Sequence, residues 1–154
     1  MKTKTIAIHA LCATCAVFLA FTQCTKEPKV EPNITFENVN TLRPTVYADQ
    51  NQASQVIQFT TTGAWTSTVN PAAGSRESGT PNWVLISPSS GNTAGNYTVT
   101  VYFGTNATGA DRRAVIMLDI DGSLVSITPT QKATTQSGEI PTTPTLPTVP
   151  IQPL

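Results

Sequence analysis

Histidine, cysteine and charge are all scarce in this 154-residue chain, which has one histidine, three cysteines and 12% charged residues. His9, Cys12 and Cys15 lie in an N-terminal apolar segment that we expect to be cleaved off, and Cys24 is expected to carry a lipid. The mature chain then has no imidazole and no free thiol. This excludes Ser-His and Cys-His nucleophiles, His or thiolate zinc sites and an internal disulfide. The spacing of Cys12 and Cys15 is that of a redox or metal motif, but both would be lost with the segment.

Hydrolysis by a pair of carboxylates stays open on composition, because glycosidases need only two acidic residues. Most acidic residues fall in predicted turns or terminal segments, so we expect no enzyme and no cofactor. Without Lys2 and Lys4 the mature chain has 7 basic against 9 acidic residues, a net charge of −2, with no stripe of Lys or Arg. Since nucleic-acid binding needs clustered basic residues, we expect no nucleic-acid partner.

The first 23 residues have the pattern of a secretory signal peptide. Lys2 and Lys4 precede an apolar run, residues 6–21, that is too short for a spanning helix. Residues 21–24, Phe-Thr-Gln-Cys, resemble the cleavage box of bacterial lipoproteins, which implies lipidation of Cys24. A plain cleaved secretory signal is the alternative.

The segment that follows, residues 24–33, is charged and contains proline, which predicts a flexible tether. We therefore expect a protein held at the outer membrane through its lipid alone. The cell surface is the expected side, and the periplasmic face is the alternative.

From residue 34 onward the pattern is all-β. Thr, Val, Ile and aromatic residues recur at a period of two between Gly, Asn, Pro and Ser turns, with no sustained helical period. The expected strands are 34–39, 45–47, 55–60, 65–69, 83–87, 97–103, 113–120 and 124–128. About seven to eight short strands at this spacing predict a β-sandwich of two antiparallel sheets over residues 34–133.

Alternation also assigns the faces of two strands. The residues expected to point inward are Tyr97, Val99, Val101, Phe103, Ala114, Ile116, Leu118 and Ile120, and those expected outward are Thr98, Thr100 and Tyr102. Asp121 and Gly122 predict a tight hairpin, because a primed turn needs positive φ. Asp119 and Asp121 do not make a calcium loop, since further acidic ligands are missing.

Five short motifs resemble the BACON family, the Bacteroidetes-associated carbohydrate-binding often N-terminal domain. They occur in the family's order at residues 64–66, 83–91, 97–101, 106–116 and 127–131, within a region from about 54 to 133. The resemblance implies an immunoglobulin-like β-sandwich with a carbohydrate-binding role. The loop at 70–82 is longer than usual for the family, and Pro129 predicts an edge strand or a bulge because it lacks an N–H.

The candidate ligand-binding residues are Arg76, Glu77 and Asn82 on the long loop and the outward Tyr102. Loops at the end of a sandwich are where binding is usually found. An ordinary solvated loop and surface tyrosine are the alternative.

Trp65 and Trp83 are candidates by residue type, since sugars stack on aromatic rings, but their positions beside apolar strands favour core packing. For Arg112 we expect a clamp on a turn near Asn106 rather than a ligand contact. No metal site is expected.

The last 21 residues, 134–154, are rich in Pro and Thr, with prolines at 141, 144, 147, 150 and 153. A spacing of three matches polyproline II, so this tail should be extended, with its prolines along one edge. It is predicted to be a stalk, a docking peptide or a disordered terminus.

Together these features predict a non-catalytic lipoprotein of the cell envelope that binds carbohydrate, either a polysaccharide or a mucin-type glycan. The alternative is a structural or assembly lipoprotein that binds another envelope protein through its loop or its proline-rich tail.

Overall fold

The computed structural model describes residues 33–49, 53–75, 77 and 79–151. The predicted signal peptide, Cys24 and nearly all of the predicted tether lie outside these residues, as does Arg76. Within the described ranges, no helix is both long and apolar enough to cross a membrane.

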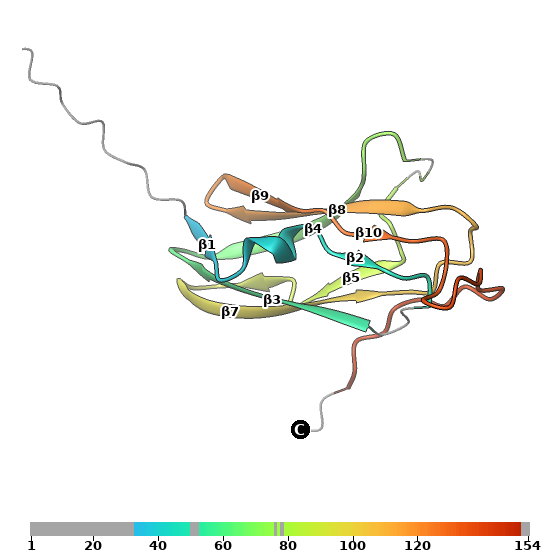
Figure 1. Cartoon of the computed structure of the whole chain (residues 1–154). Coiled ribbons are helices and arrows are strands. Elements are labelled where there is room, and N and C mark those ends of the chain that lie inside the picture. Colours follow the sequence, from blue (N-terminus) through green and yellow to red (C-terminus); the bar gives the residue numbers. More distant parts are fainter. Residues whose placement is uncertain (1–32, 50–52, 76, 78, 152–154) are drawn as a thin grey trace, which may run out of the picture. The chain divides into compact units, whose positions relative to one another are not determined.

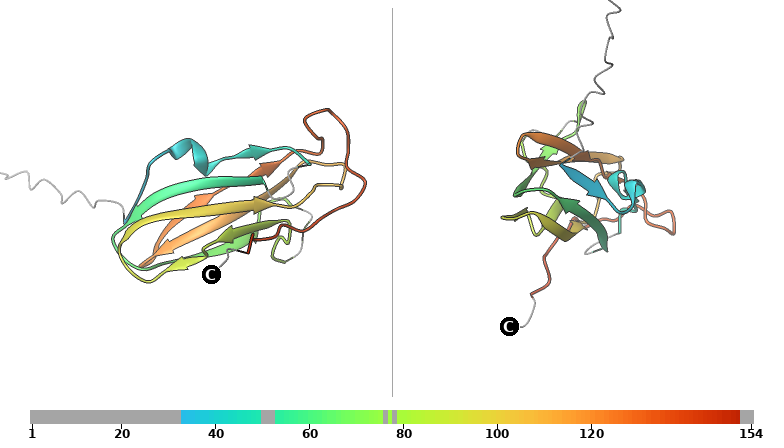
Figure 2. Two further views of the ribbon diagram at one scale, coloured as in Figure 1. Left: turned by 90° about the horizontal axis from the view of Figure 1, so that it is seen from below. Right: turned by 90° about the vertical axis from the view of Figure 1, so that its left-hand side faces the viewer.

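Two sheets lie face to face (Figure 1, Figure 2). In the first, the strand order is β1 (Ile34–Phe36), β3 (Ala53–Thr61), β7 (Gly95–Phe103) and β5 (Val84–Ser87). In the second it is β2 (Thr45–Val46), β10 (Thr130–Gln131), β8 (Arg112–Ile120), β4 (Trp65–Pro71) and β6 (Ser90–Gly91), and β9 (Ser123–Ile127) also pairs with β8. The predicted two-sheet β-sandwich is confirmed. The part of the chain that the structure describes has ten strands because β2, β6 and β10, of two residues each, add to the longer ones.

Two details of the predicted strands are wrong. The first strand ends at Phe36, and Val39 begins a 3-10 helix, η1 (Val39–Leu42). The physical reason is Asn38, whose side chain accepts a hydrogen bond from the Asn40 N–H at 2.9 Å and so caps the helix start. In addition, β2 and β10 pair in parallel, whereas both sheets were expected to be antiparallel.

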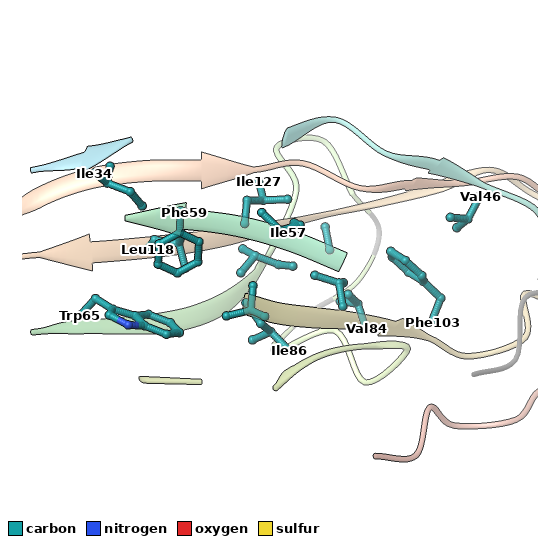
Figure 3. Close-up of a cluster of buried hydrophobic side chains, with 14 of the residues drawn as sticks. Ile34, Val46, Ile57, Phe59, Trp65, Val84, Ile86, Phe103, Leu118 and Ile127 are labelled. Carbon is teal, nitrogen blue, oxygen red and sulfur yellow. The ribbon is translucent and has the colours of Figure 1, made fainter. Parts of the chain in front are cut away.

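The core fills the space between the sheets, where side chains from both layers point toward one another (Figure 3). The predicted inward residues of β8 are all fully buried, as are Val99, Val101 and Phe103 of β7, and Tyr97 packs against the core's edge. The assigned faces are therefore confirmed for both strands. Each fully buried aliphatic side chain stabilises the fold by about 1.5–3 kcal/mol.

The β8–β9 hairpin turns at Asp121 and Gly122, as predicted. Their φ angles are 50° and 84°, and the Gly122 N–H donates to the Asp119 carboxylate at 2.8 Å. Positive φ at both central residues is typical of a type I′ turn, whose backbone twist matches that of the two strands it connects.

Pro129 marks neither a sheet edge nor a bulge, so that prediction is wrong. β9 and β10 follow one register along β8, and β10 lies between β2 and β8. Ala114 donates its N–H to the Pro129 carbonyl at 3.3 Å, but the proline has no N–H to return. The sheet therefore lacks one backbone hydrogen bond to β8 at this position, and the residues on either side keep the same register.

The proline-rich tail packs against the sandwich, which the sequence did not predict, and its extended polyproline II form stays a prediction. The Thr105 N–H donates to the Thr145 carbonyl at 3.0 Å, and the two hydroxyl oxygens lie 2.7 Å apart. A Cβ added at Gly104 would collide with that carbonyl and lie 3.0 Å from Cδ of Pro147. Figure 2 shows the segment after β10 looping out and returning to the sandwich. Pro153 lies outside the described residues.

Candidate functional site

The structure places the sequence candidates on different surfaces. Glu77 is half-buried and lines a pocket, whereas Asn82 is exposed in the turn before β5. Tyr102 is half-exposed on the outer face of the first sheet, paired with Leu85 of β5. Asn82 and Tyr102 do not line the pocket, and Arg76 lies outside the described residues.

Neither tryptophan presents a ring face to a ligand. Trp65 is 1% exposed and packs edge-on against Phe59, with ring centroids 5.1 Å apart. Its N–H has no hydrogen-bond acceptor among the residues described, and the glycine at 91 lies so close that an added Cβ would collide with it. Trp83 is also 1% exposed, and its N–H donates to the Glu77 carboxylate at 3.1 Å.

The pocket has a volume of about 570 Å³ and lies at one end of the sandwich. β4 and β8 are antiparallel neighbours whose pairing ends with Pro71 opposite Ala114. The chain leaving β4 and the chain entering β8 must therefore lie side by side, and the pocket forms between them. Its lining residues are Ala72, Ala73, Gly74, Ser75, Glu77, Thr108, Ala110, Asp111, Arg112 and Arg113.

Arg112 forms the inner wall of this pocket, and its guanidinium is fixed on three sides. Nε donates to the Gln131 side-chain oxygen at 2.9 Å, and Nη2 donates to the carbonyls of Gly104 and Thr105 at 3.2 and 3.0 Å. The guanidinium carbon lies 4.5 Å from the ring centroid of Trp83, in cation–π contact. The expected clamp on the chain next to Asn106 is confirmed.

Burial lowers the pKa of Arg112 to about 10, while the nearby negative charge of Glu77 raises it. Arg112 therefore stays protonated at neutral pH. It offers the pocket a permanent positive charge that cannot move, because its hydrogen bonds hold the guanidinium plane in place.

Asn106 lies behind the lining and holds Thr108 and Ala110 in place. It is fully buried and donates to the carbonyls of Ala110 and Lys132 at 2.9 and 2.8 Å. Its oxygen accepts the Thr108 hydroxyl at 2.6 Å. One amide thus closes the turn before β8 and ties it to Lys132, the residue that follows β10.

The two remaining charges of the lining differ in their surroundings. Asp111 accepts from the Lys132 ammonium at 3.0 Å and from the Ala133 N–H at 2.8 Å. Of these two bonds the one from Ala133 lowers its pKa most, followed by that from Lys132. Arg113 is exposed, on the outer face of β8.

Sequence reasoning missed Ser75, Thr108, Asp111 and Arg113 as pocket residues. The adjacent arginines were the available signal, but nothing local in the sequence shows that residues near 75 meet residues near 110. Across the described ranges, His, Cys, Asp and Glu form no cluster of three that could hold a metal ion.

Comparison with known proteins defines the fold. No protein family matches the chain by sequence, and no curated protein does so either. A solved structure of a Bacteroides ovatus GH5 xyloglucanase in complex with a XXXG heptasaccharide is similar, with 17% identity and a TM-score of 0.51. That match covers 64% of this chain and only 18% of the xyloglucanase chain.

Two further structures match more weakly. A protein from Bacteroides thetaiotaomicron has 15% identity and a TM-score of 0.45, with 69% of this chain and 91% of that chain covered. WR4, a C. elegans MSP family member, has 10% identity and a TM-score of 0.38, with coverages of 66% and 98%. The protein is thus an immunoglobulin-like β-sandwich similar in fold to a part of a Bacteroides enzyme.

Proposed function

We propose that this protein is a non-catalytic binding module and that it binds carbohydrate in the pocket between residues 72–75 and 77 on one side and residues 108–113 on the other. The observation that carries the proposal is the pocket itself. Its volume of about 570 Å³ lies in the range of small-ligand sites, roughly 300–1,000 Å³. Guanidinium, carboxylate and hydroxyl groups line it, and these are the groups that bond sugar hydroxyls.

The pocket differs from a stacking site because its described lining contains no aromatic ring. Trp83 lies behind Arg112, which covers the ring face. Recognition in this pocket would therefore depend on hydrogen bonds from the polar and charged groups of the lining, with little ring stacking.

The cellular setting is part of the same proposal. The signal-peptide pattern and Cys24 support a lipid-anchored protein of the outer membrane that faces the cell surface. The five BACON-like motifs support membership of that family, whose carbohydrate-binding role agrees with the proposed pocket.

A glycan array probed with purified Thr25–Leu154 tests the proposal. We expect reproducible binding to one glycan class, weakened by Arg113→Ala. Arg43→Ala is the matched control, because Arg43 is also an exposed arginine but does not line the pocket. A folded sample that binds no glycan would refute the proposal.

A second candidate function is assembly with another envelope protein through the tail. The supporting observation is the exposure of Leu146 and Ile151, which are 64% and 96% exposed on a segment that is itself docked. Affinity purification of the full chain and of a Leu146→Asn, Ile151→Asn variant tests this. Equal recovery of partners by both proteins would count against it.

A further inference from the structure

The pocket lining carries two positive groups, Arg112 and Arg113, and two negative groups, Glu77 and Asp111. Lys132, which lies outside the lining, pairs with Asp111 at 3.0 Å, and Glu77 lies near the positive charge of Arg112. Arg113 helps to lower the pKa of Asp111 through its charge, but it makes no hydrogen bond or ion pair with the residues that the structure describes. These five groups carry three positive and two negative charges, so one positive charge remains for a ligand.

Ser75 and Arg113 supply hydrogen-bond donors to the pocket that are not used within the protein. Both oxygens of Asp111 already accept bonds, and the Thr108 hydroxyl donates to Asn106. The Ser75 oxygen accepts the Glu77 N–H at 2.9 Å, which leaves the hydroxyl proton to donate. Arg113 adds five N–H donors. Arg113 and Ser75 thus bring unused donors to the pocket, which suit a ligand group that only accepts.

We propose that the glycan bound in this pocket is acidic, and that its carboxylate or sulfate group pairs with Arg113. A planar guanidinium can bind such a group through two parallel hydrogen bonds, which a neutral hydroxyl cannot match. This inference rests on the proposed carbohydrate-binding function and names the class of sugar for it.

Titration calorimetry with matched oligosaccharides tests the inference on purified Thr25–Leu154. The first pair of probes is a galacturonic acid hexamer and its fully methyl-esterified form. The second is a heparin hexasaccharide and its desulfated form, which loses the sulfates but keeps the carboxylates. In at least one pair we expect the unmodified acidic probe to bind about tenfold or more tightly than its modified partner, a difference of about 1.4 kcal/mol. The preference should weaken as salt is added.

Variants locate the acidic group. Arg113→Ala should remove the preference for the acidic probe, and Arg113→Lys should keep part of it, because lysine retains the charge but not the planar fork. Arg43→Ala should bind like the wild type. The pair of probes that shows the preference identifies the anion as carboxylate or sulfate.

The possible failures are distinct. Equal affinity for the unmodified and modified probes, with binding still weakened by Arg113→Ala, would overturn the inference but leave the carbohydrate function standing. An acidic preference that survives Arg113→Ala would also overturn the inference, because the anion would then bind elsewhere. No binding to any probe or array glycan by the folded protein would overturn both.

Discussion

Replacing Arg112 by alanine should cost more stability than replacing any other charged residue around the pocket. The guanidinium bonds the Gln131 side chain and two backbone carbonyls, and it covers the ring of Trp83. Gln131 is fully buried, so its oxygen would lose its partner where water has little access. Alanine also leaves an unfilled space beside the indole.

The magnitude follows from these contacts. A hydrogen bond from a charged donor contributes about 1.5–3 kcal/mol, and a cation–π contact about 0.5–2 kcal/mol. Because Arg112 is only half-buried, water can reach part of the vacated space and replace some of the lost bonds. We therefore expect a loss of about 3 kcal/mol in the free energy of unfolding, out of the 5–15 kcal/mol that is typical of a domain.

Urea unfolding followed by tryptophan fluorescence measures this loss directly, since both tryptophans are buried in the folded state. Arg112→Lys should recover little, because one ammonium cannot reproduce the planar fork. Arg113→Ala is the control and should stay within about 0.5 kcal/mol of the wild type, as expected for an exposed side chain. A loss below about 1 kcal/mol for Arg112→Ala would refute the structural role given to these bonds.

Three further predictions follow from single contacts. Gly104→Ala should release the docked tail, seen as faster limited proteolysis of the C-terminal segment, because the added Cβ collides with it; unchanged proteolysis would contradict this. Asp111→Asn should be less stable than the wild type near neutral pH. This difference in the free energy of unfolding should vanish as the pH falls from about 3.8 through the lowered pKa of Asp111, because the wild type then also loses the charge. A difference that does not change with pH would argue against the pairing of Asp111 with Lys132. Trp83→Phe should cost about 1–3 kcal/mol more than Trp65→Phe in urea unfolding, because it leaves the Glu77 carboxylate without its donor, whereas the Trp65 N–H has no acceptor; equal losses would contradict the assignment.

The sequence predicted the parts of the fold that depend on neighbouring residues. Alternation of apolar and polar side chains identified the inner faces of β7 and β8, because successive residues of a strand point to opposite sides. Asp121 and Gly122 identified the hairpin, since few residues tolerate its backbone angles. The strand at 45–47 was predicted, but its parallel pairing with β10 was not. β6 and β10 were not predicted as separate strands, because two residues carry no periodic signal.

The site depended on contacts between residues far apart in the chain. Glu77 was selected from its loop, but its partner Trp83 and the neighbouring Arg112 follow only from the packing. The pocket exists because β4 lies beside β8, and that neighbour relation is a long-range pairing that no local pattern encodes.

The tail shows the same division. Prolines at every third residue predict an extended segment, since proline fixes φ and removes a donor. That the segment lies against the sandwich was decided by tertiary structure, because the contact needs the Thr105 N–H and the missing side chain of Gly104 at one place. The backbone conformation that each residue prefers depends on that residue and its neighbours, so it can be predicted from the sequence. The hydrogen-bond partner of a backbone N–H in a loop depends on which distant segments pack together, so it is decided by the tertiary structure.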